Sequence, residues 1–326
     1  MFILKKILLI HTGGTISMIE DKITGTVAPT DNSPLQDITK ILNKIARIEE
    51  LFLFNLPSPQ ITPAHMLKLG QTIHDKIALG NFDGVVVTHG TDTLEETAYF
   101  LDLYLQIRKP VIITGAMRSS NEIGSDALYN LISSVMVASS DEAQDKGVLV
   151  VMNDEIHTAK YVTKTSTSNI ATFQSPQFGP IGIITKQAIY FHQKLLSDES
   201  FPIQTLTKNV VLIKIYAGID KGFVQAIHKS GIDGLVIEGL GQGNVPKEIV
   251  EPIRAMLDDN IPVILVSRSY QGIVQPTYSY QGGGKGLKEM GVIFATGLTG
   301  PKARIKLLIA LEMTTNLNEL IPMFEV

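Results

Sequence analysis

The chain has 326 residues, of which 44% are hydrophobic, and its formal net charge is -4. This length suits two domains, and the hydrophobic content is sufficient for sizeable cores, so the chain is expected to be folded. The small net charge gives no reason to expect a nucleic acid as partner. The chain has no cysteine, which excludes disulfides and thiol nucleophiles and suits a reducing, cytoplasmic setting. Its first apolar run, residues 7–10, is too short for a signal peptide, and no run has membrane-spanning length.

The first part of the chain alternates buried strands with amphipathic helices. Strands are expected at residues 7–10, 51–56, 85–87, 110–114 and 147–152, and helices at residues 33–47, 62–79, 93–105 and 126–138. Residues 18–30 have no apolar period, so they are expected to form a loop, either a mobile lid or an ordinary surface excursion. The alternation predicts an α/β fold with a large N-terminal domain, residues 1–191, built on a doubly wound, mostly parallel sheet.

The second part of the chain repeats the alternation on a smaller scale. Residues 192–208 have weak periodicity and mixed charge, and we interpret them as a linker. Strands are then expected at residues 209–215, 234–237, 262–266 and 292–295, and helices at residues 222–229, 246–257 and 301–311. These elements predict a smaller C-terminal α/β domain, residues 209–326. The seven histidines are scattered without ligand spacing, so no metal site is expected.

Candidate site residues follow four of the expected strands; in chain order they are Thr12, Ser58, Thr91, Asp92 and Ala116. The carboxyl ends of parallel strands meet at one edge of a sheet, and ligands bind there. The sequence therefore predicts one site, rich in hydroxyl groups, at this edge. For the threonine and serine positions an ordinary turn remains the alternative, because such side chains often cap backbone N–H groups.

The residue types at this edge favour attack on a carbonyl group. A threonine hydroxyl is a poor nucleophile unless a base takes its proton, and a lysine kept neutral in a buried, hydroxyl-rich setting could be that base. Lys164, within the polar residues 162–167, is the candidate, although a lysine in such a segment is most often solvated. The N–H groups of the Gly13–Gly14 turn could form an oxyanion hole. Together these residues suggest acyl or amide transfer.

Four motifs carry a family resemblance: Thr-Gly-Gly-Thr-Ile at residues 12–16, Thr-His-Gly-Thr-Asp-Thr at 88–93, Gly-Ala-Met-Arg at 115–118 and Val-Thr-Lys-Thr at 162–165. The chain resembles the bacterial L-asparaginase family over nearly its whole length. The resemblance implies hydrolysis of L-asparagine to L-aspartate and ammonia through an acyl-enzyme intermediate, with weak glutaminase activity and no cofactor. It also implies a homotetramer, a dimer of dimers, with sites at the dimer interface.

The resemblance assigns catalytic roles to four residues. Thr12 matches the nucleophile, while Thr91, Asp92 and Lys164 match a second relay of hydroxyl, carboxylate and amine. The order in which Thr12 and Thr91 attack is left open.

The resemblance also assigns the substrate-binding residues. Ser58 would hold the substrate α-carboxylate, Asp92 would meet the α-amino group, and the Ala116 carbonyl would take the side-chain amide. Asn244 matches a residue supplied to the neighbouring protomer's site. Pro59 stands where the family often has glutamine, which puts one contact to the α-amino group in doubt.

The expected loop lacks the tyrosine that the family usually carries there, where it is thought to shuttle a proton. Thr26 lies in the matching part of the loop, and Tyr278 and Tyr280 offer phenols in a segment that the family extends toward a neighbouring site. Alternation in an extended strand would place both rings on one face. Packing at the subunit interface is the alternative role for these rings.

Two other functions compete with hydrolysis of asparagine. One is an ammonia-supplying amidotransferase subunit, which would carry an added N-terminal domain, whereas here the first strand begins within a few residues of Met1. The other is a catalytically silent amino-acid-binding protein, which the presence of Thr12, Thr91 and Lys164 disfavours.

Overall fold

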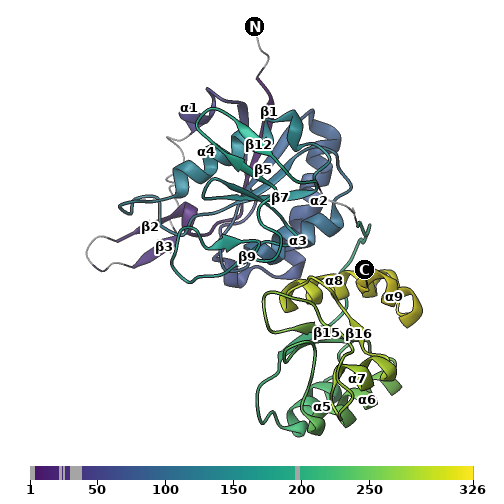
Figure 1. Cartoon of the computed structure of the whole chain (residues 1–326). Helices are drawn as coiled ribbons and strands as arrows, with labels where there is room; N and C mark the ends of the chain where they lie inside the picture. The colour runs from purple at the N-terminus through teal and green to yellow at the C-terminus, as the bar shows by residue number, and fades with distance from the viewer. Residues whose placement is uncertain (1–3, 22–23, 25, 30–38, 195–198, 326) are drawn as a thin grey trace. The chain divides into compact units, whose positions relative to one another are not determined.

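The computed structural model describes residues 4–21, 24, 26–29, 39–194 and 199–325. The chain divides into two compact units, Met1–Ser200 and Phe201–Val326, shown from purple to teal and from green to yellow in Figure 1. The boundary between the units falls within residues 192–208.

An eight-stranded sheet forms the centre of the first unit, in the order β12-β11-β8-β7-β6-β5-β1-β4. Its strands are β1 (Lys6–His11), β4 (Arg47–Phe52), β5 (Gly84–Thr88), β6 (Val111–Thr114), β7 (Val148–Met152), β8 (Glu155–Thr158), β11 (Gly182–Ile184) and β12 (Ile189–Phe191). The first five of these pair in parallel, and the last three extend the sheet by antiparallel pairs. The mostly parallel sheet predicted from the sequence is confirmed.

Helices cover both faces of this sheet, as the doubly wound pattern predicts. The helices are α1 (Thr39–Leu42), α2 (Pro63–Gly80), α3 (Leu94–Tyr104) and α4 (Ala127–Ala138), with short 3-10 turns η1 (Thr15–Ser17), η2 (Ser58–Gln60) and η3 (Asp141–Ala143). On one face, Leu131 and Val135 of α4 join a core with Val86 and Ile112. All five residues of β5 are buried, so its opposite face is covered as well. An apolar run without alternation is typical of such a doubly covered strand.

Some elements differ from the sequence-based expectation. Residues 33–38 of the expected helix 33–47 lie outside the described part of the chain. Helix α1 ends at Leu42, so the end of the helix was predicted too late. Strand β4 begins at Arg47, so the strand expected at residues 51–56 was also predicted too late. The expected loop 18–30 contains an antiparallel pair, β2 (Met18–Glu20) and β3 (Val27–Pro29). The sequence did not predict a second short antiparallel pair, β9 (Thr163–Lys164) with β10 (Phe173–Gln174). It also did not predict strands β8, β11 and β12. Each of these strands has only two to four residues, which is too few to show a periodicity.

The second unit is a smaller α/β domain with a four-stranded parallel sheet, as expected. Its strands lie in the order β13 (Val210–Lys214), β14 (Gly234–Gly239), β15 (Val263–Ser267) and β16 (Ile293–Phe294). Its helices are α5 (Lys221–Lys229), α6 (Val250–Asp258), α7 (Gly284–Met290), α8 (Gly300–Met313) and α9 (Leu317–Phe324), with a 3-10 turn, η4 (Lys247–Ile249). Helices α5, α6 and α7 contribute to the core on one face, and α8 and α9 to that on the other. The sequence missed α7, whose glycines resemble a turn, and α9, which contains Pro322.

Candidate active site

The site is built on the carboxyl ends of neighbouring parallel strands, where β1 and β5 end in glycine-rich turns. Gly13 and Gly14 have φ angles of 104° and 85°, which other residues rarely adopt. A Cβ atom on Gly13 would lie 2.5 Å from the backbone of Leu56, and one on Gly14 would lie 2.3 Å from Gly90. The glycines therefore let three backbone segments meet at one point, and this contact positions Thr12 beside the turn that follows β5.

Thr12 is held against β5 by two hydrogen bonds to one carbonyl. Its backbone N–H and its hydroxyl donate to the Thr88 oxygen, at 3.1 and 2.8 Å. The residue is almost fully buried, and no hydrogen bond joins its hydroxyl to Lys164 in the part of the chain that the structure describes. The Thr12 proton therefore faces a backbone carbonyl, and the hydroxyl must leave this bond before a base can take the proton.

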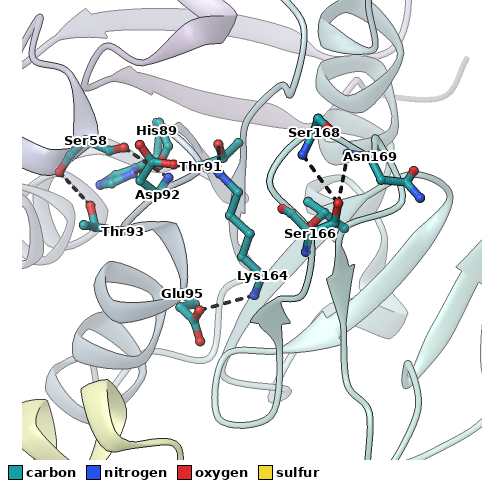
Figure 2. Close-up of polar contacts among 12 residues, drawn as sticks. Ser58, His89, Thr91, Asp92, Thr93, Glu95, Lys164, Ser166, Ser168 and Asn169 are labelled. Carbon is teal, nitrogen blue, oxygen red and sulfur yellow. Dashed lines mark hydrogen bonds and ion pairs between the residues drawn. The ribbon is translucent and has the colours of Figure 1, made fainter. Parts of the chain in front are cut away.

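A second group of polar side chains, Thr91, Asp92 and Lys164, lies in direct contact (Figure 2). The Lys164 Nζ donates to the Thr91 hydroxyl at 2.9 Å and to an Asp92 carboxylate oxygen at 2.7 Å. The Lys164 side chain is only 16% exposed, whereas that of Asp92 is 60% exposed. Lys164 is therefore not a solvated surface lysine, and it bridges a buried hydroxyl and a carboxylate that is open to solvent.

Glu95 fixes the strand that carries Lys164 to the start of α3. Its carboxylate accepts hydrogen bonds from the Thr163 hydroxyl at 3.1 Å and from the Lys164 N–H at 3.2 Å. Figure 2 shows the contact with Lys164. Glu95 also lies in the first turn of α3, where a carboxylate interacts favourably with the helix dipole. Its contact with β9 depends on residues about seventy positions away, which no local pattern reveals.

Ser58 joins the turn after β4 to the turn after β5. Its hydroxyl accepts the Asp92 N–H at 3.1 Å, and its carbonyl accepts the Thr93 hydroxyl at 2.8 Å, as Figure 2 shows. Ser58 is buried, and Pro59 beside it is exposed and has no backbone N–H to donate. Ser58 and Asp92 thus lie together, as expected from their strands.

His89 is a buried part of this turn that the sequence did not assign. Its Nδ1 donates to the Gly90 carbonyl at 2.8 Å, which leaves Nε2 to accept the Thr97 hydroxyl at 2.9 Å. Burial lowers the pKa of His89 to about 4. The ring is therefore neutral near pH 7, and it ties the turn containing Thr91 to helix α3.

Two further candidates contact residues of their own unit. Thr26 is exposed next to β3, where its hydroxyl contacts that of Thr24 at 2.8 Å. In the second unit, Asn244 contacts the Leu240 carbonyl at 3.4 Å and accepts the Gly284 N–H at 3.2 Å.

The two candidate tyrosines also belong to the second unit. Tyr278 and Tyr280 are exposed, with ring centroids 5.7 Å apart. Their segment forms no strand, so the predicted extended strand is wrong. The two rings nevertheless lie side by side, and the backbone turns directly after them, with the Gly283 N–H donating to the Tyr280 carbonyl.

The described residues lack a metal cluster and a membrane-spanning helix. They contain no group of three or more histidine, aspartate or glutamate side chains arranged to hold a metal ion. None of their helices is both long and apolar enough to cross a bilayer.

Family models match both units of the chain. The model described as "Asparaginase, N-terminal" matches residues 6–197, and that described as "Glutaminase/Asparaginase C-terminal domain" matches residues 209–324. The chain belongs to the asparaginase family. The resemblance inferred from the motifs is therefore confirmed, and with it an enzyme of the L-asparaginase type.

Individual relatives match over most of their length. An L-asparaginase from Bacillus licheniformis is 37% identical over 94% of this chain and 95% of its own. A glutamyl-tRNA(Gln) amidotransferase component from Methanobrevibacter smithii is 35% identical, over 97% of this chain and 74% of its own. The crystal structure of a "Probable Cytoplasmic L-asparaginase" from Campylobacter jejuni superposes with a TM-score of 0.88 at 31% identity, covering 98% of this chain and 99% of that one.

Proposed function

We propose that this chain hydrolyses L-asparagine to L-aspartate and ammonia through an acyl-enzyme formed on Thr12, with weak activity toward L-glutamine. The observation that supports this best is the contact of Lys164 with both Thr91 and Asp92, beside the strand end that carries Thr12. Two hydroxyls, a carboxylate and an amine then line one edge of the sheet. Amidohydrolase chemistry needs such groups: a nucleophile, a route for its proton and a charge to orient the substrate.

In the first half of the reaction, the Thr12 oxygen attacks the carbonyl carbon of the substrate side-chain amide. The hydroxyl proton passes to the relay, and negative charge develops on the carbonyl oxygen, where N–H groups of the Gly13–Gly14 turn stabilise it. The C–N bond then breaks, the nitrogen takes a proton and leaves as ammonia, and an ester joins Thr12 to the substrate. Because the Thr12 hydroxyl now bonds to the Thr88 carbonyl, substrate binding must draw it away.

In the second half, water attacks the ester and releases aspartate. The water loses a proton as it attacks, and the Thr12 oxygen takes one as the ester bond breaks. Thr91 takes part in this transfer, a role supported by Lys164, which donates to the Thr91 oxygen and stabilises negative charge that develops there. Asp92 fixes the amine at 2.7 Å. Thr91, Asp92 and Lys164 therefore act as one unit, and removal of any member should disable the others.

The same edge of the sheet offers recognition for an α-amino acid. Asp92 presents a largely exposed carboxylate that can accept the substrate ammonium, while the Ser58 hydroxyl beside it can donate to the α-carboxylate. Pro59 cannot supply the amide contact that the family often has at this position. The α-amino group is thus held mainly by Asp92, and binding of the substrate should depend strongly on that residue.

The active assembly is proposed to be a cytoplasmic homotetramer, a dimer of dimers, in which the domain of residues 209–326 contributes to the neighbouring protomer's site. Asn244 would enter that site. One phenol of Tyr278 or Tyr280 would replace the missing loop tyrosine, since both side chains are exposed and Thr26 faces Thr24 instead. The Campylobacter neighbour's name supports the cytoplasmic location.

The competing functions are disfavoured. L-asparaginase from Bacillus licheniformis matches along 95% of its length, whereas the amidotransferase component matches along 74% of its own. A silent binding protein would not need Thr12, Thr91 and Lys164 together.

Purified protein supplied with L-asparagine, L-glutamine or no substrate tests the proposal. Ammonia should appear with asparagine, more slowly with glutamine, and without any tRNA or partner protein. Rapid acid quenching followed by mass spectrometry of peptides should find an aspartyl ester on the peptide that contains Thr12. Ammonia release from neither amino acid would contradict the enzyme, and an ester on another residue would contradict the assignment of the nucleophile.

A further inference from the structure

The Ala116 carbonyl is buried without a hydrogen-bond donor. Ala116 follows β6 and has no exposed surface, and no donor reaches its oxygen anywhere in the described ranges of the chain. Buried carbonyls are nearly always paired, because an unpaired one has lost its bonds to water without compensation. An orphaned carbonyl at the edge of a candidate active site therefore indicates a position that a ligand N–H would satisfy.

Asp126 holds the peptide unit that contains this carbonyl. Both of its carboxylate oxygens lie 3.1 Å from the Met117 nitrogen, and one also accepts the Arg118 N–H at 3.0 Å. The Met117 N–H and the Ala116 C=O belong to one trans peptide and point in opposite directions. Anchoring the N–H on Asp126 therefore directs the Ala116 oxygen away from α4.

Asp126 is unusual for its place in the helix. It is the N-cap residue of α4, where an aspartate normally accepts backbone N–H groups of its own helix, but its side chain makes no such bond. By contrast, the N-cap residue Asp220 of α5 accepts the Gly222 N–H at 2.7 Å. The Asp126 carboxylate is thus used on the loop after β6 and not on the backbone of its helix.

Asn130, one turn further along α4, fixes the other side of Ala116. Its side-chain nitrogen donates to the Gly115 carbonyl at 3.0 Å and to Asp126 at 2.9 Å, while its oxygen accepts the Asn153 N–H at 3.0 Å. Asn130 is buried, and these three bonds leave its amide a single orientation. The peptides before and after Ala116 are therefore both anchored to α4.

We infer that Asp126 is a positioning residue that orients and polarises the Ala116 carbonyl to accept the side-chain N–H of an amide substrate, with Asn130 as its support. The inference rests on the proposed function. A carboxylate that accepts the N–H of a peptide draws electron density toward the C=O of the same unit, so the oxygen becomes a stronger acceptor. Such an oxygen favours an amide, which donates, over an ester or the carboxylate product, which do not. Asp126 therefore contributes to selectivity for amides.

The experiment compares two substrates that differ only in the group the carbonyl would bind. Wild-type protein and the Asp126→Asn variant are assayed with L-asparagine and with the β-methyl ester of L-aspartate, which has no N–H at this position. The Asp126 carboxylate accepts N–H groups of Met117, Arg118 and Asn130, and in the variant one of these N–H groups loses its acceptor. The Ala116 carbonyl is then held less firmly, so kcat/KM for asparagine should fall about tenfold or more. The value for the ester should change less than about twofold. Inhibition by L-aspartate should strengthen relative to binding of asparagine.

Asp220→Asn is the matched control, because it neutralises an N-cap aspartate far from the site in sequence and should leave both substrates unaffected. An equal fall in kcat/KM for the amide and the ester in Asp126→Asn, or no fall for the amide, would overturn the inference. If Asp126→Asn does not fold, as judged by circular dichroism, Asn130→Ser serves the same comparison and should again reduce amide turnover selectively. A wild-type protein that is inactive on asparagine would instead refute the proposed function itself.

Discussion

Burial of His89 should make the stability of this protein depend on pH in a specific range. The ring lies between the Gly90 carbonyl and the Thr97 hydroxyl, and burial lowers its pKa from 6.5 to about 4. Between these two values the unfolded chain binds a proton that the folded chain does not. The free energy of unfolding therefore falls as the pH drops from about 6.5 toward 4, and this part of the stability is fully present above pH 6.5.

The size of this loss follows from the pKa difference. A shift of one unit corresponds to about 1.36 kcal/mol, so the whole transition amounts to about 3 kcal/mol. Between pH 7.5 and pH 5 the expected loss from His89 alone is about 2 kcal/mol. This is a large fraction of the stability of an ordinary domain, so it should be readily measurable.

The assay is equilibrium unfolding in urea at pH 7.5, 6 and 5, at one protomer concentration, for wild type and His89→Gln. The variant should be less stable at pH 7.5, because two buried hydrogen bonds change. The difference in the free energy of unfolding between wild type and variant should then be smaller by about 2 kcal/mol at pH 5. Ser134→Ala, which removes a buried hydroxyl that does not titrate, should keep a constant gap at each pH. Parallel curves for wild type and His89→Gln would refute this account of His89.

Three further predictions concern the relay, the tyrosines and the assembly. Lys164→Met should reduce kcat about as much as Thr91→Val, and the double variant should lose little more, whereas losses that multiply would separate Lys164 from the relay. Tyr278→Phe or Tyr280→Phe should lower turnover about tenfold or more with unchanged thermal stability; full activity of both and of the double variant would exclude a phenol shuttle. A calibrated size-exclusion column at assay concentration should show a tetramer, and a fully active monomer would contradict a site shared between protomers.

The sequence predicted best the features that depend on local patterns. The three valines of β5 are apolar without alternation, which identified a strand buried on both faces, and the turn after it placed Thr91 and Asp92 at the correct edge of the sheet. Strand β4 was misplaced because it lies at the sheet edge and carries charged residues such as Glu49, which hide its period. Strand β9 was missed because it has only two residues, too few to show the alternation of apolar and polar side chains that identifies a strand.

The residues that support the candidate site were harder to predict than its candidate catalytic residues. Thr12 and Thr91 stand in glycine-rich turns, which mark functional sites by their backbone requirements. Asp126 looks like an ordinary helix cap in the sequence, and His89 like one more turn residue. Their contacts, such as that of Asp126 with Met117, depend on how the loop folds back on the helix.

Ammonia release from L-asparagine by purified wild-type protein, measured beside the Thr12→Ala variant, tests the central claim most directly. Wild type should release ammonia and L-aspartate in equal amounts. Thr12→Ala should lose several orders of magnitude in kcat, on the scale of lost nucleophiles, with little change in its unfolding midpoint, because the turn contributes little packing. A variant that folds and turns over asparagine at close to the wild-type rate would contradict the assignment of Thr12 as the nucleophile.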